Sequence, residues 1–345
     1  MIRSIFKKKA HLLFVLLCAN TVNAQWRKQE SGTDASFRSI HAISRKVVWA
    51  GGSKGTVLRT TNAGSKWHVI KVNGAEKLDF RDIYGVSEKV AYIMSAGLAE
   101  EGAAKVFKTT DGGKTWKVVL EYKDKGAFFD SMDFWNEKEG ILIGDPIDDK
   151  PFILRTLDAG NTWQRIDRNK LPPILEGEAS FASSGTCVAV QPNGKAWLNT
   201  QSRIFFTADK GENWQVYNTP FIKGQTSGIF GLHFWSESQG IAVGGDYKND
   251  KEKVNNVAIT HDAGKTWEFL ASAKPDGLKE GGWMLPNKSL LLVGTSGTSL
   301  LKEDDGTPPE PEWKAIDNES FHSISCFKGA CWAIGGKGNL AKWGK

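Results

Sequence analysis

Several features that mark common enzyme classes are missing from this sequence. Its four cysteines form no cluster with histidine, and the six histidines show no ligand spacing, so we expect no metal site. No glycine-rich dinucleotide fingerprint opens a helix, and no Gly-x-Ser-x-Gly elbow is present. These absences argue against a zinc enzyme, a dinucleotide-dependent oxidoreductase and a serine hydrolase, and we expect no cofactor.

Long apolar runs are missing too. The nearest approach to one lies in residues 1–24, where Arg3 and three lysines precede the short run Leu12–Leu17 and a small-residue site before Gln25. This pattern predicts a signal peptide, because the run is too short to cross a bilayer. We therefore expect a periplasmic or secreted protein without a transmembrane segment.

An excess of one charge is also lacking once residues 1–24 are set aside. The full chain has 45 Lys and Arg against 39 Asp and Glu, but four of the basic residues belong to that segment, which leaves 41. So small a net charge provides no basic field for nucleic acid. In an oxidising compartment, Cys326 and Cys331 either form a disulfide across a predicted hairpin or remain two buried thiols.

Glycine and tryptophan, by contrast, are abundant, with 37 and 14 residues, and they recur in a repeated octet. The closing tryptophans are spaced 49, 47, 51 and 53 residues apart, a period typical of propeller blades. The five octets are TTNAGSKW (60–67), TTDGGKTW (109–116), TLDAGNTW (156–163), TADKGENW (207–214) and THDAGKTW (260–267).

Short apolar runs around each octet predict four strands per unit. In the fourth unit, for example, we expect the first strand to open at Phe181 and the second to be CVAV (187–190). Two weaker units follow, and the last lacks an outer strand, which residues 25–31 with Trp26 would supply. The sequence thus predicts a single all-β domain over 25–345, a seven-bladed propeller of four-stranded blades whose ring is closed by the N-terminal strand. The first strands of the five clear units open at Phe37, Phe80, Phe129, Phe181 and Phe230.

The chemistry of the octet fits a structural turn. Its third residue, Asp or Asn, is expected to accept hydrogen bonds from backbone N–H groups two residues on, and its glycine permits a positive φ. The final tryptophan is expected to wedge between neighbouring blades. The third residues of the octets are Asn62, Asp111, Asp158, Asp209 and Asp262.

These motifs carry a family resemblance. The octet is similar to the Asp-box, or BNR repeat, of sialidases and related propellers. The longer stretches FRSIHAISRKVVWAGGSKGTVLRTTNAGSKW, IGDPIDDKPFILRT, EGEASFASSGT and GIFGLHF…GIAVGGDY resemble the photosystem II assembly/stability factors and their non-photosynthetic bacterial relatives, often labelled "oxidoreductase" or "glycosyl hydrolase-like". The resemblance covers essentially the whole chain after residue 24. It implies the propeller fold and a helper role in assembling other proteins.

Strand order separates the two faces of the predicted ring. The octets join third to fourth strands, so they lie opposite the face that holds the starts of the first strands and the loops between second and third strands. Those loops are expected to be long in blades three to five, and long loops on one face commonly build a site. The candidate binding residues on this face are Arg38, Arg81, Asp130, Arg203, Asp246 and His322.

An alternative hypothesis is a sialidase-like glycoside hydrolase acting on an acidic glycan. It would use three arginines, Arg38, Arg81 and Arg203, to hold a carboxylate. Catalysis would fall to Tyr247 paired with Glu178, and Asp145 would serve as the acid.

We favour non-catalytic recognition as the function. The expected partner is a protein, a peptide or an anionic ligand bound on the face opposite the octets, and the protein is expected to be a monomer. Because the fold does not choose between binding and hydrolysis, the arrangement of the site has to decide.

Overall fold

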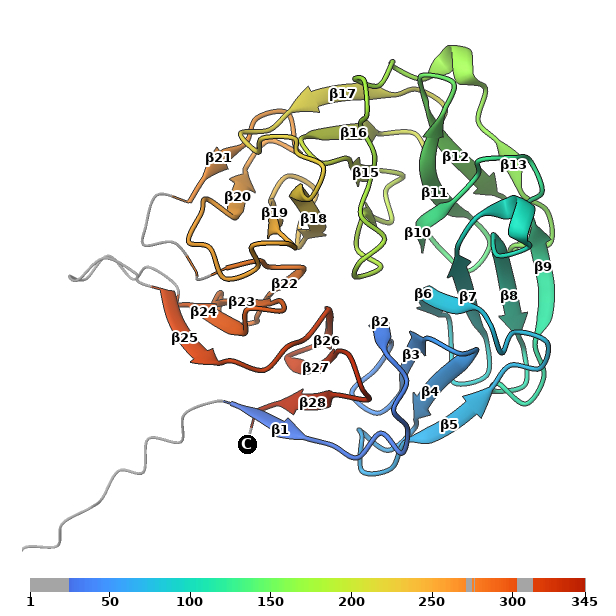
Figure 1. Ribbon diagram of the computed structural model, residues 1–345, viewed down its shortest axis with the longest axis vertical. Coiled ribbons are helices and arrows are strands. Elements are labelled where there is room, and N and C mark those ends of the chain that lie inside the picture. The colour runs from blue at the N-terminus through green and yellow to red at the C-terminus, as the bar shows by residue number, and fades with distance from the viewer. Residues whose placement is uncertain (1–24, 271–274, 276, 303–312, 345) are drawn as a thin grey trace, which may run out of the picture.

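Seven four-stranded antiparallel sheets stand around a common centre in the computed structural model, which describes residues 25–270, 275, 277–302 and 313–344 (Figure 1). The predicted seven-bladed, all-β propeller is therefore confirmed. The predicted signal peptide at 1–24 and most of the degenerate sixth octet lie outside the described residues. Within the described part, helical structure is confined to two 3-10 turns, η1 (Ala99–Glu101) and η2 (Arg168–Lys170).

Each blade runs from an inner strand at the channel to an outer strand at the rim. The strands of blades one to three are β2 (Phe37–Ala42), β3 (Val48–Gly52), β4 (Thr56–Thr60), β5 (His68–Lys71), β6 (Asp79–Gly85), β7 (Ala91–Ala96), β8 (Lys105–Thr109), β9 (Lys117–Glu121), β10 (Phe129–Phe134), β11 (Gly140–Ile147), β12 (Lys150–Thr156) and β13 (Gln164–Arg165). The strands of blades four to six are β14 (Val188–Val190), β15 (Ala196–Asn199), β16 (Arg203–Thr207), β17 (Gln215–Asn218), β18 (Ser227–Phe234), β19 (Gly240–Asp246), β20 (Val257–Thr260), β21 (Glu268–Phe269), β22 (Gly281–Met284), β23 (Leu290–Val293), β24 (Thr298–Leu301) and β25 (Trp313–Asp317).

The seventh blade is built from both ends of the chain, as predicted. The C-terminal strands β26 (Ser323–Phe327), β27 (Ala330–Ile334) and β28 (Leu340–Trp343) are completed by β1 (Trp26–Lys28), which pairs with β28. The Trp26 ring packs 5.3 Å from Phe321 and 5.1 Å from Trp343, and its Nε1 donates to Thr298 Oγ1 of blade six at 2.8 Å. The N-terminal strand therefore closes the ring and also binds the neighbouring blade.

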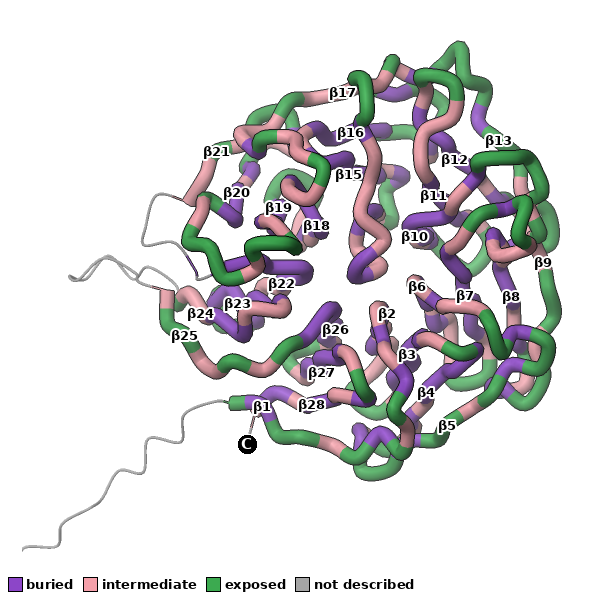
Figure 2. The backbone as a smooth tube through the Cα atoms, viewed as in Figure 1, coloured by how far each residue is buried: buried purple, intermediate pink, exposed green. Residues whose placement is uncertain are grey.

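The core lies between the blades, where aromatic residues of the second strands are buried. Trp49 and Trp197 have no exposed surface, and each donates its indole N–H to a backbone carbonyl of the next blade. The Trp197 ring also stacks on Phe234 of that blade at 3.8 Å. Burying a large apolar side chain contributes about 1.5–3 kcal/mol, so these contacts join blades that share no hydrogen-bonded strands. Figure 2 shows the strands nearest the centre mostly buried and the rim exposed.

The octets form one turn repeated five times. In THDAGKTW, Thr260 Oγ1 accepts from Gly264 N at 2.9 Å, while Asp262 accepts from the backbone N of Thr266 at 2.9 Å and from its hydroxyl at 2.6 Å. The Asp262 carboxylate thus accepts from the residue four positions later, and not from the residue two positions later that we expected. Gly264 has a φ of +81°. The closing Trp267 packs against Phe234, in a cluster shared with blade four.

Blade four corrects one strand assignment. Its inner strand is β14, within the stretch that the sequence assigned to the second strand, and the second strand is β15, which the sequence analysis missed. The Asn193-Gly194 pair between them is a hairpin signal that would have shown the error. Phe181, expected to open the inner strand, instead belongs to the long connection that precedes it.

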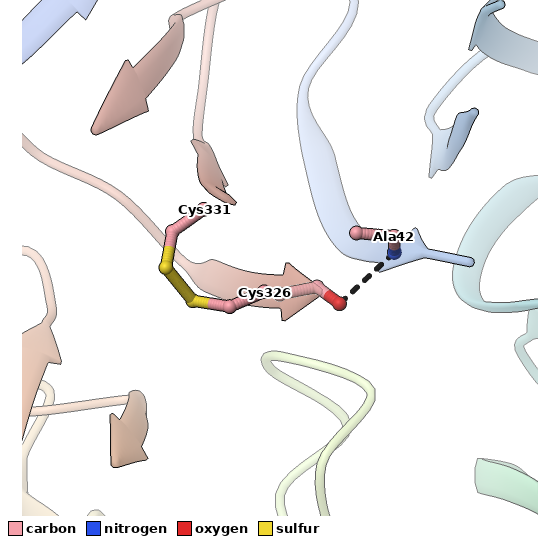
Figure 3. The surroundings of a disulfide bond; sticks show 4 residues. Ala42, Cys326 and Cys331 are labelled. Carbon is pink, nitrogen blue, oxygen red and sulfur yellow. Dashed lines mark hydrogen bonds between the residues drawn. A yellow bond between two sulfur atoms is a disulfide. The ribbon is translucent and has the colours of Figure 1, made fainter. Parts of the chain in front are cut away.

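A disulfide joins Cys326 and Cys331, which face each other across the β26–β27 hairpin (Figure 3). Both residues are buried. The neighbouring Ser325 Oγ accepts a hydrogen bond from the backbone N of Ala42 in blade one at 3.0 Å. The alternatives left open by the sequence thus resolve to the bridge, beside the contact between the last blade and the first.

No helix in the described ranges has the length and apolar character needed to span a bilayer.

Candidate functional site

Three of the candidate charged residues owe their position to the same local irregularity. In β2, β6 and β10 the pairing register shifts near the start of the strand, and the residue left unpaired is Arg38, Arg81 or Asp130. A β-bulge inserts one extra residue and re-aims its side chain. All three side chains line a common cavity at this end of the channel, which also includes His322 at the start of blade seven. We call it the mouth cavity.

The two arginines form the cationic side of the mouth cavity. Arg38 Nη1 lies 3.4 Å from His322 Nδ1 and 3.9 Å from Glu280 Oε1, and these are its polar side-chain contacts within the described residues. Arg81 donates from Nε to Asp79 Oδ2 at 2.7 Å and from Nη1 to the carbonyl of Ala182 at 2.7 Å. A guanidinium has five N–H donors, so both groups keep donors for a ligand.

Two carboxyl groups form an acidic side. Asp130 is 1% exposed, and its Oδ2 has no hydrogen-bond partner among the described residues. Burial and the nearby Asp145 raise the pKa of Asp130 well above its usual range, although Arg81 opposes the shift. Burial also raises the pKa of Asp145 to about 6. A carboxyl group that keeps its proton can donate a hydrogen bond, so near neutral pH this pair offers both a donor and acceptors.

Glu280 belongs to the site and was missed in the sequence. Glu280, just before β22, is the residue of blade six that lines the mouth cavity. Its side chain is 3% exposed, and its Oε2 lies 2.7 Å from His322 Nδ1. In blade five the residue left unpaired by the register shift is Phe230, which also lines the cavity.

Aromatic rings form the third side of the mouth cavity. Phe181 stacks on Phe230 with ring centroids 4.3 Å apart, and Tyr247 meets Phe181 edge-on at 6.1 Å. Tyr247 is 51% exposed and therefore stands at the entrance. The cavity has a volume of about 440 Å³, within the range of ligand pockets.

Residues 180–186, here named the channel loop, form the floor of this cavity. Figure 1 shows the connection between β13 and β14 descending into the middle of the ring. Bonds from three other blades hold it: Arg81 donates to the Ala182 carbonyl, Ser323 Oγ to that of Ser184 at 2.9 Å, and Leu232 N to that of Thr186 at 2.9 Å. A loop inside the channel was not predicted from the sequence.

Close packing fixes the tip of the channel loop. Gly185 has a φ of +65°, and a Cβ at this position would come within 2.6 Å of Asp82 Oδ1 and 2.9 Å of Ser39 Cβ. Any larger residue would therefore displace the loop from the channel. The channel loop is therefore packed into the channel, and all of its residues are buried or half-buried.

The Arg203 and Glu178 side chains contact each other, and neither lines the mouth cavity, where the sequence had predicted both. Arg203 begins β16, and its guanidinium contacts the Glu178 carboxylate through Nη2 and through Nε at 2.8 Å. Glu178 is 2% exposed and also accepts from Thr200. Because hydrogen bonds to Arg203 and Thr200 outweigh its burial, the pKa of Glu178 is lowered. This pair anchors the base of the connection that carries the channel loop.

The constellation required for hydrolysis is therefore not assembled. Tyr247 and Asp145 line the mouth cavity, but Glu178, the glutamate expected to pair with Tyr247, does not line it and is engaged by Arg203. Arg203 does not join the other two arginines. Asp246 lies on the neighbouring rim, where it lines a second cavity with Phe221 and Ile222 and caps the N–H of Lys248 at 2.8 Å.

The loop lengths also differ from expectation. The connection between second and third strands is two residues in blade three and three residues in blade four, and it is long only in blade five among these three. Two long connections on this face are residues 166–187, which include the channel loop, and residues 247–256. Their tertiary contacts, rather than local turn signals, set where they go.

Comparison with known proteins supports the resemblance. A family model described as photosynthesis system II assembly factor YCF48 matches residues 94–216. The chain is 25% identical over 256 residues to the photosystem II stability/assembly factor HCF136 of Arabidopsis thaliana, covering 69% of this chain. It spans 59% of the length of that relative. The chain thus resembles these assembly factors.

Solved structures share the fold. One described as YCF48 bound to D1 peptide superposes with a TM-score of 0.63 at 17% identity, covering 93% of this chain and 95% of that one. A streptogramin B lyase superposes with a TM-score of 0.67 at 14% identity, covering 93% and 98%. At such identities the likeness shows the fold alone, and the same fold serves both a peptide binder and a lyase.

Proposed function

We propose that this propeller is a non-catalytic assembly factor that holds a peptide segment of a client protein in the mouth cavity. The observation that carries the proposal is the cavity itself, with free guanidinium donors on one side, two carboxyl groups of raised pKa on another and an aromatic wall at its entrance. The resemblance to photosystem II stability/assembly factors, and the YCF48 structure with a peptide, support the same role.

Each side of the cavity suits one part of a peptide. Guanidinium groups bind carboxylates through paired N–H donors, so Arg38 and Arg81 would receive an acidic side chain or a chain terminus. The protonated member of the Asp130–Asp145 pair would donate to a backbone carbonyl. Phe181, Phe230 and Tyr247 would pack against an apolar side chain.

Site-specific crosslinking tests this proposal. A photoreactive p-benzoyl-phenylalanine in place of Tyr247 would stand at the cavity entrance, and the same residue in place of the exposed His261 would stand among the octets. We expect irradiation of cells that make the protein to yield a discrete client adduct from position 247 and none from position 261. Equal labelling from both positions, or none from position 247, would contradict the proposal.

We also infer that the mature protein begins at Gln25, acts outside the cytoplasm and is a monomer. The basic, apolar and small-residue pattern of residues 1–24 supports export. The mass of the protein recovered from the exported fraction tests this inference, because removal of residues 1–24 leaves Gln25 at the N-terminus. A mass that includes those residues would refute the cleavage.

The hydrolase alternative has the weaker support. Its nucleophile would be Tyr247 activated by Glu178, and that carboxylate is held by Arg203 and Thr200 instead. A screen of the purified protein with sialosides is the direct test. Turnover that is lost on Tyr247→Phe would revive the alternative and displace the binding proposal.

A further inference from the structure

Another cavity, distinct from the mouth cavity and from the rim cavity beside Asp246, has a volume of about 430 Å³ and lies in the other half of the channel. The channel loop separates it from the mouth cavity, because Ser180–Ser183 line the mouth cavity while Ser184, Gly185 and Thr186 line this one. Its remaining walls come from residues of the inner strands that follow those lining the mouth cavity, so by strand order it faces the octets. We call it the octet-side cavity, and nothing in the proposed function uses it.

Aromatic rings dominate the wall of the octet-side cavity. The His41 and Tyr84 rings are tilted by 38° with their centroids 4.7 Å apart, and His233 stacks on Trp283 with centroids 4.2 Å apart. Trp235 lines the same space, with its ring 6.2 Å from His233. These side chains are half-buried rather than packed into the core, so part of each ring remains open to the cavity.

The charge of the wall has one sign. Asp82 and Asp133 line the cavity, and no lysine or arginine appears among the described residues around it. Burial lowers the pKa of His41 to about 4 and that of His233 to about 3, so both rings are neutral near pH 7. An aromatic space with carboxylates and no cation of its own attracts positive charge, since ring faces carry negative potential.

Asp133 is the carboxylate with capacity left for a ligand. Asp82 already accepts from Ile83 N, Ser131 Oγ and Met132 N. Among the described residues, Asp133 accepts from two backbone groups only, Phe134 N at 2.8 Å and Val190 N at 3.1 Å. Two oxygens provide about four acceptor sites, so Asp133 retains about half of its capacity.

Two polar atoms of residues that line this cavity, Ser39 Oγ and His233 Nε2, have no hydrogen-bond partner among the described residues. His233 Nε2 is buried, and no described residue comes within hydrogen-bonding distance of it. Buried polar atoms are nearly always paired, and leaving one unpaired costs about 1–3 kcal/mol. A ligand that carries an N–H or O–H group would supply the missing bond.

We propose that the octet-side cavity binds an alkylammonium group, held against the Trp283 ring and facing the Asp133 carboxylate. The volume accommodates a free amine of modest size or the side chain of a lysine from a partner protein. Both sources share the chemistry that the wall recognises, a compact cation on a short apolar stem.

Calorimetric titration with choline tests the site, with 3,3-dimethylbutanol as the neutral isostere. Burial raises the pKa of Asp133 to about 7, so the titration is run at pH 8, where its carboxylate is ionised. We expect choline to bind at least ~10-fold more tightly than the alcohol, because only the cation gains from ring faces and carboxylate. Equal affinities, or no choline binding up to tens of millimolar, would overturn the proposal.

Variants locate the binding. Asp133→Asn and Trp283→Leu should each weaken choline binding by ~10-fold or more, since each removes one attractive partner of the cation. Arg38→Ala, in the mouth cavity, should leave it unchanged. Melting temperatures identify any variant that fails to fold; if Asp133→Asn does so, Trp283→Leu and Trp235→Leu carry the test. Choline affinity that survives these substitutions in folded protein would refute the site.

A peptide arm distinguishes the two sources. An uncharged pentapeptide with one central lysine, and the same peptide with that lysine acetylated, are titrated alongside n-butylammonium. Tighter binding of the lysine peptide than of n-butylammonium, abolished by acetylation, assigns the site to a protein partner. Equal or tighter binding of n-butylammonium assigns it to a free amine. Binding of the acetylated peptide as tightly as the lysine peptide would contradict a cation site.

Discussion

The octet turns repeat the same bonds in five blades, whereas the mouth cavity of the same ring is formed by residues that differ among the blades. In all five octets, the first threonine hydroxyl accepts from the backbone N–H of the glycine four residues later. The side-chain oxygen of the Asp or Asn likewise accepts from the backbone N–H four residues after it. At the mouth, the equivalent positions hold arginine in blades one and two but other side chains in the later blades, and bonds from Arg38 and Arg81 cross between blades. Residues that repeat with the blade period therefore hold the ring together, and positions that break the period supply the chemistry.

The largest expected effect concerns a periodic residue, Trp26. Trp26→Ala removes a buried ring that contacts Phe321, Trp343 and Thr298, and we expect a loss of about 3–5 kcal/mol in the free energy of unfolding. Urea unfolding measures the loss, and Arg27→Ala on the exposed face of the same strand is the matched control, with little change. If Trp26→Ala is as stable as the control, the N-terminal strand does not close the ring.

Glu178 tests whether a non-periodic residue can also be structural. Glu178→Ala leaves the Arg203 guanidinium buried without its partner, and we expect a loss of about 3 kcal/mol. The double variant Glu178→Ala/Arg203→Leu should recover much of that loss, because no buried charge remains. A stable Glu178→Ala variant that no longer crosslinks its client would instead assign this pair to the binding site.

The pH dependence of folding stability tests the mouth-cavity residue Asp145. Its folded pKa of about 6 is above its unfolded value, so the folded state holds the proton more tightly, and stability falls as pH rises from about 4 to about 6. Asp145→Asn removes this penalty and should stabilise the protein by about 2 kcal/mol at pH 8, but hardly at pH 3.5. Urea unfolding at the two pH values decides; an equal effect at both would contradict the raised pKa.

The smallest effect is expected at an octet. Asp262→Ala removes acceptors for the Thr266 backbone and hydroxyl on an exposed turn, and we expect a loss of about 1 kcal/mol. The pKa of Asp262 is lowered by these bonds despite the opposing effect of burial, so its contribution should disappear as pH falls below its usual titration range. Unfolding at pH 7 and pH 2.5 measures this, and crosslinking from position 247 should not change.

The periodic part of the molecule was predictable, for physical reasons. Tryptophan, glycine and the Asp or Asn turn recur because each blade needs the same turn and the same packed ring, so blade number and ring closure could be counted along the chain. The assignment failed in blade four, where the inner strand is only Val188–Val190 and the preceding connection begins with an aromatic residue, as inner strands do elsewhere.

The site was predictable only in part. Arg38, Arg81, Asp130, Asp145, Tyr247 and His322 do line one cavity, because strand order alone places them at one end of the channel. Glu280 precedes its strand without an aromatic marker, and the Glu178–Arg203 pair depends on how a long connection folds back. The channel loop is held by bonds to blades two, five and seven, and such contacts leave no local signal in the sequence.

Client capture by the double variant Arg38→Ala/Arg81→Ala is the most direct test of the central claim. The two side chains are 28% exposed and form the cationic side of the mouth cavity, and Arg81 also donates to the Ala182 carbonyl of the channel loop, so the melting temperature of the double variant is measured beside client capture. We expect pull-down from the exported fraction to recover the client with the natural protein and with Asp262→Ala, and to lose it with the double variant. Undiminished recovery of the same client by a folded double variant would contradict the assignment of the mouth cavity as the binding site.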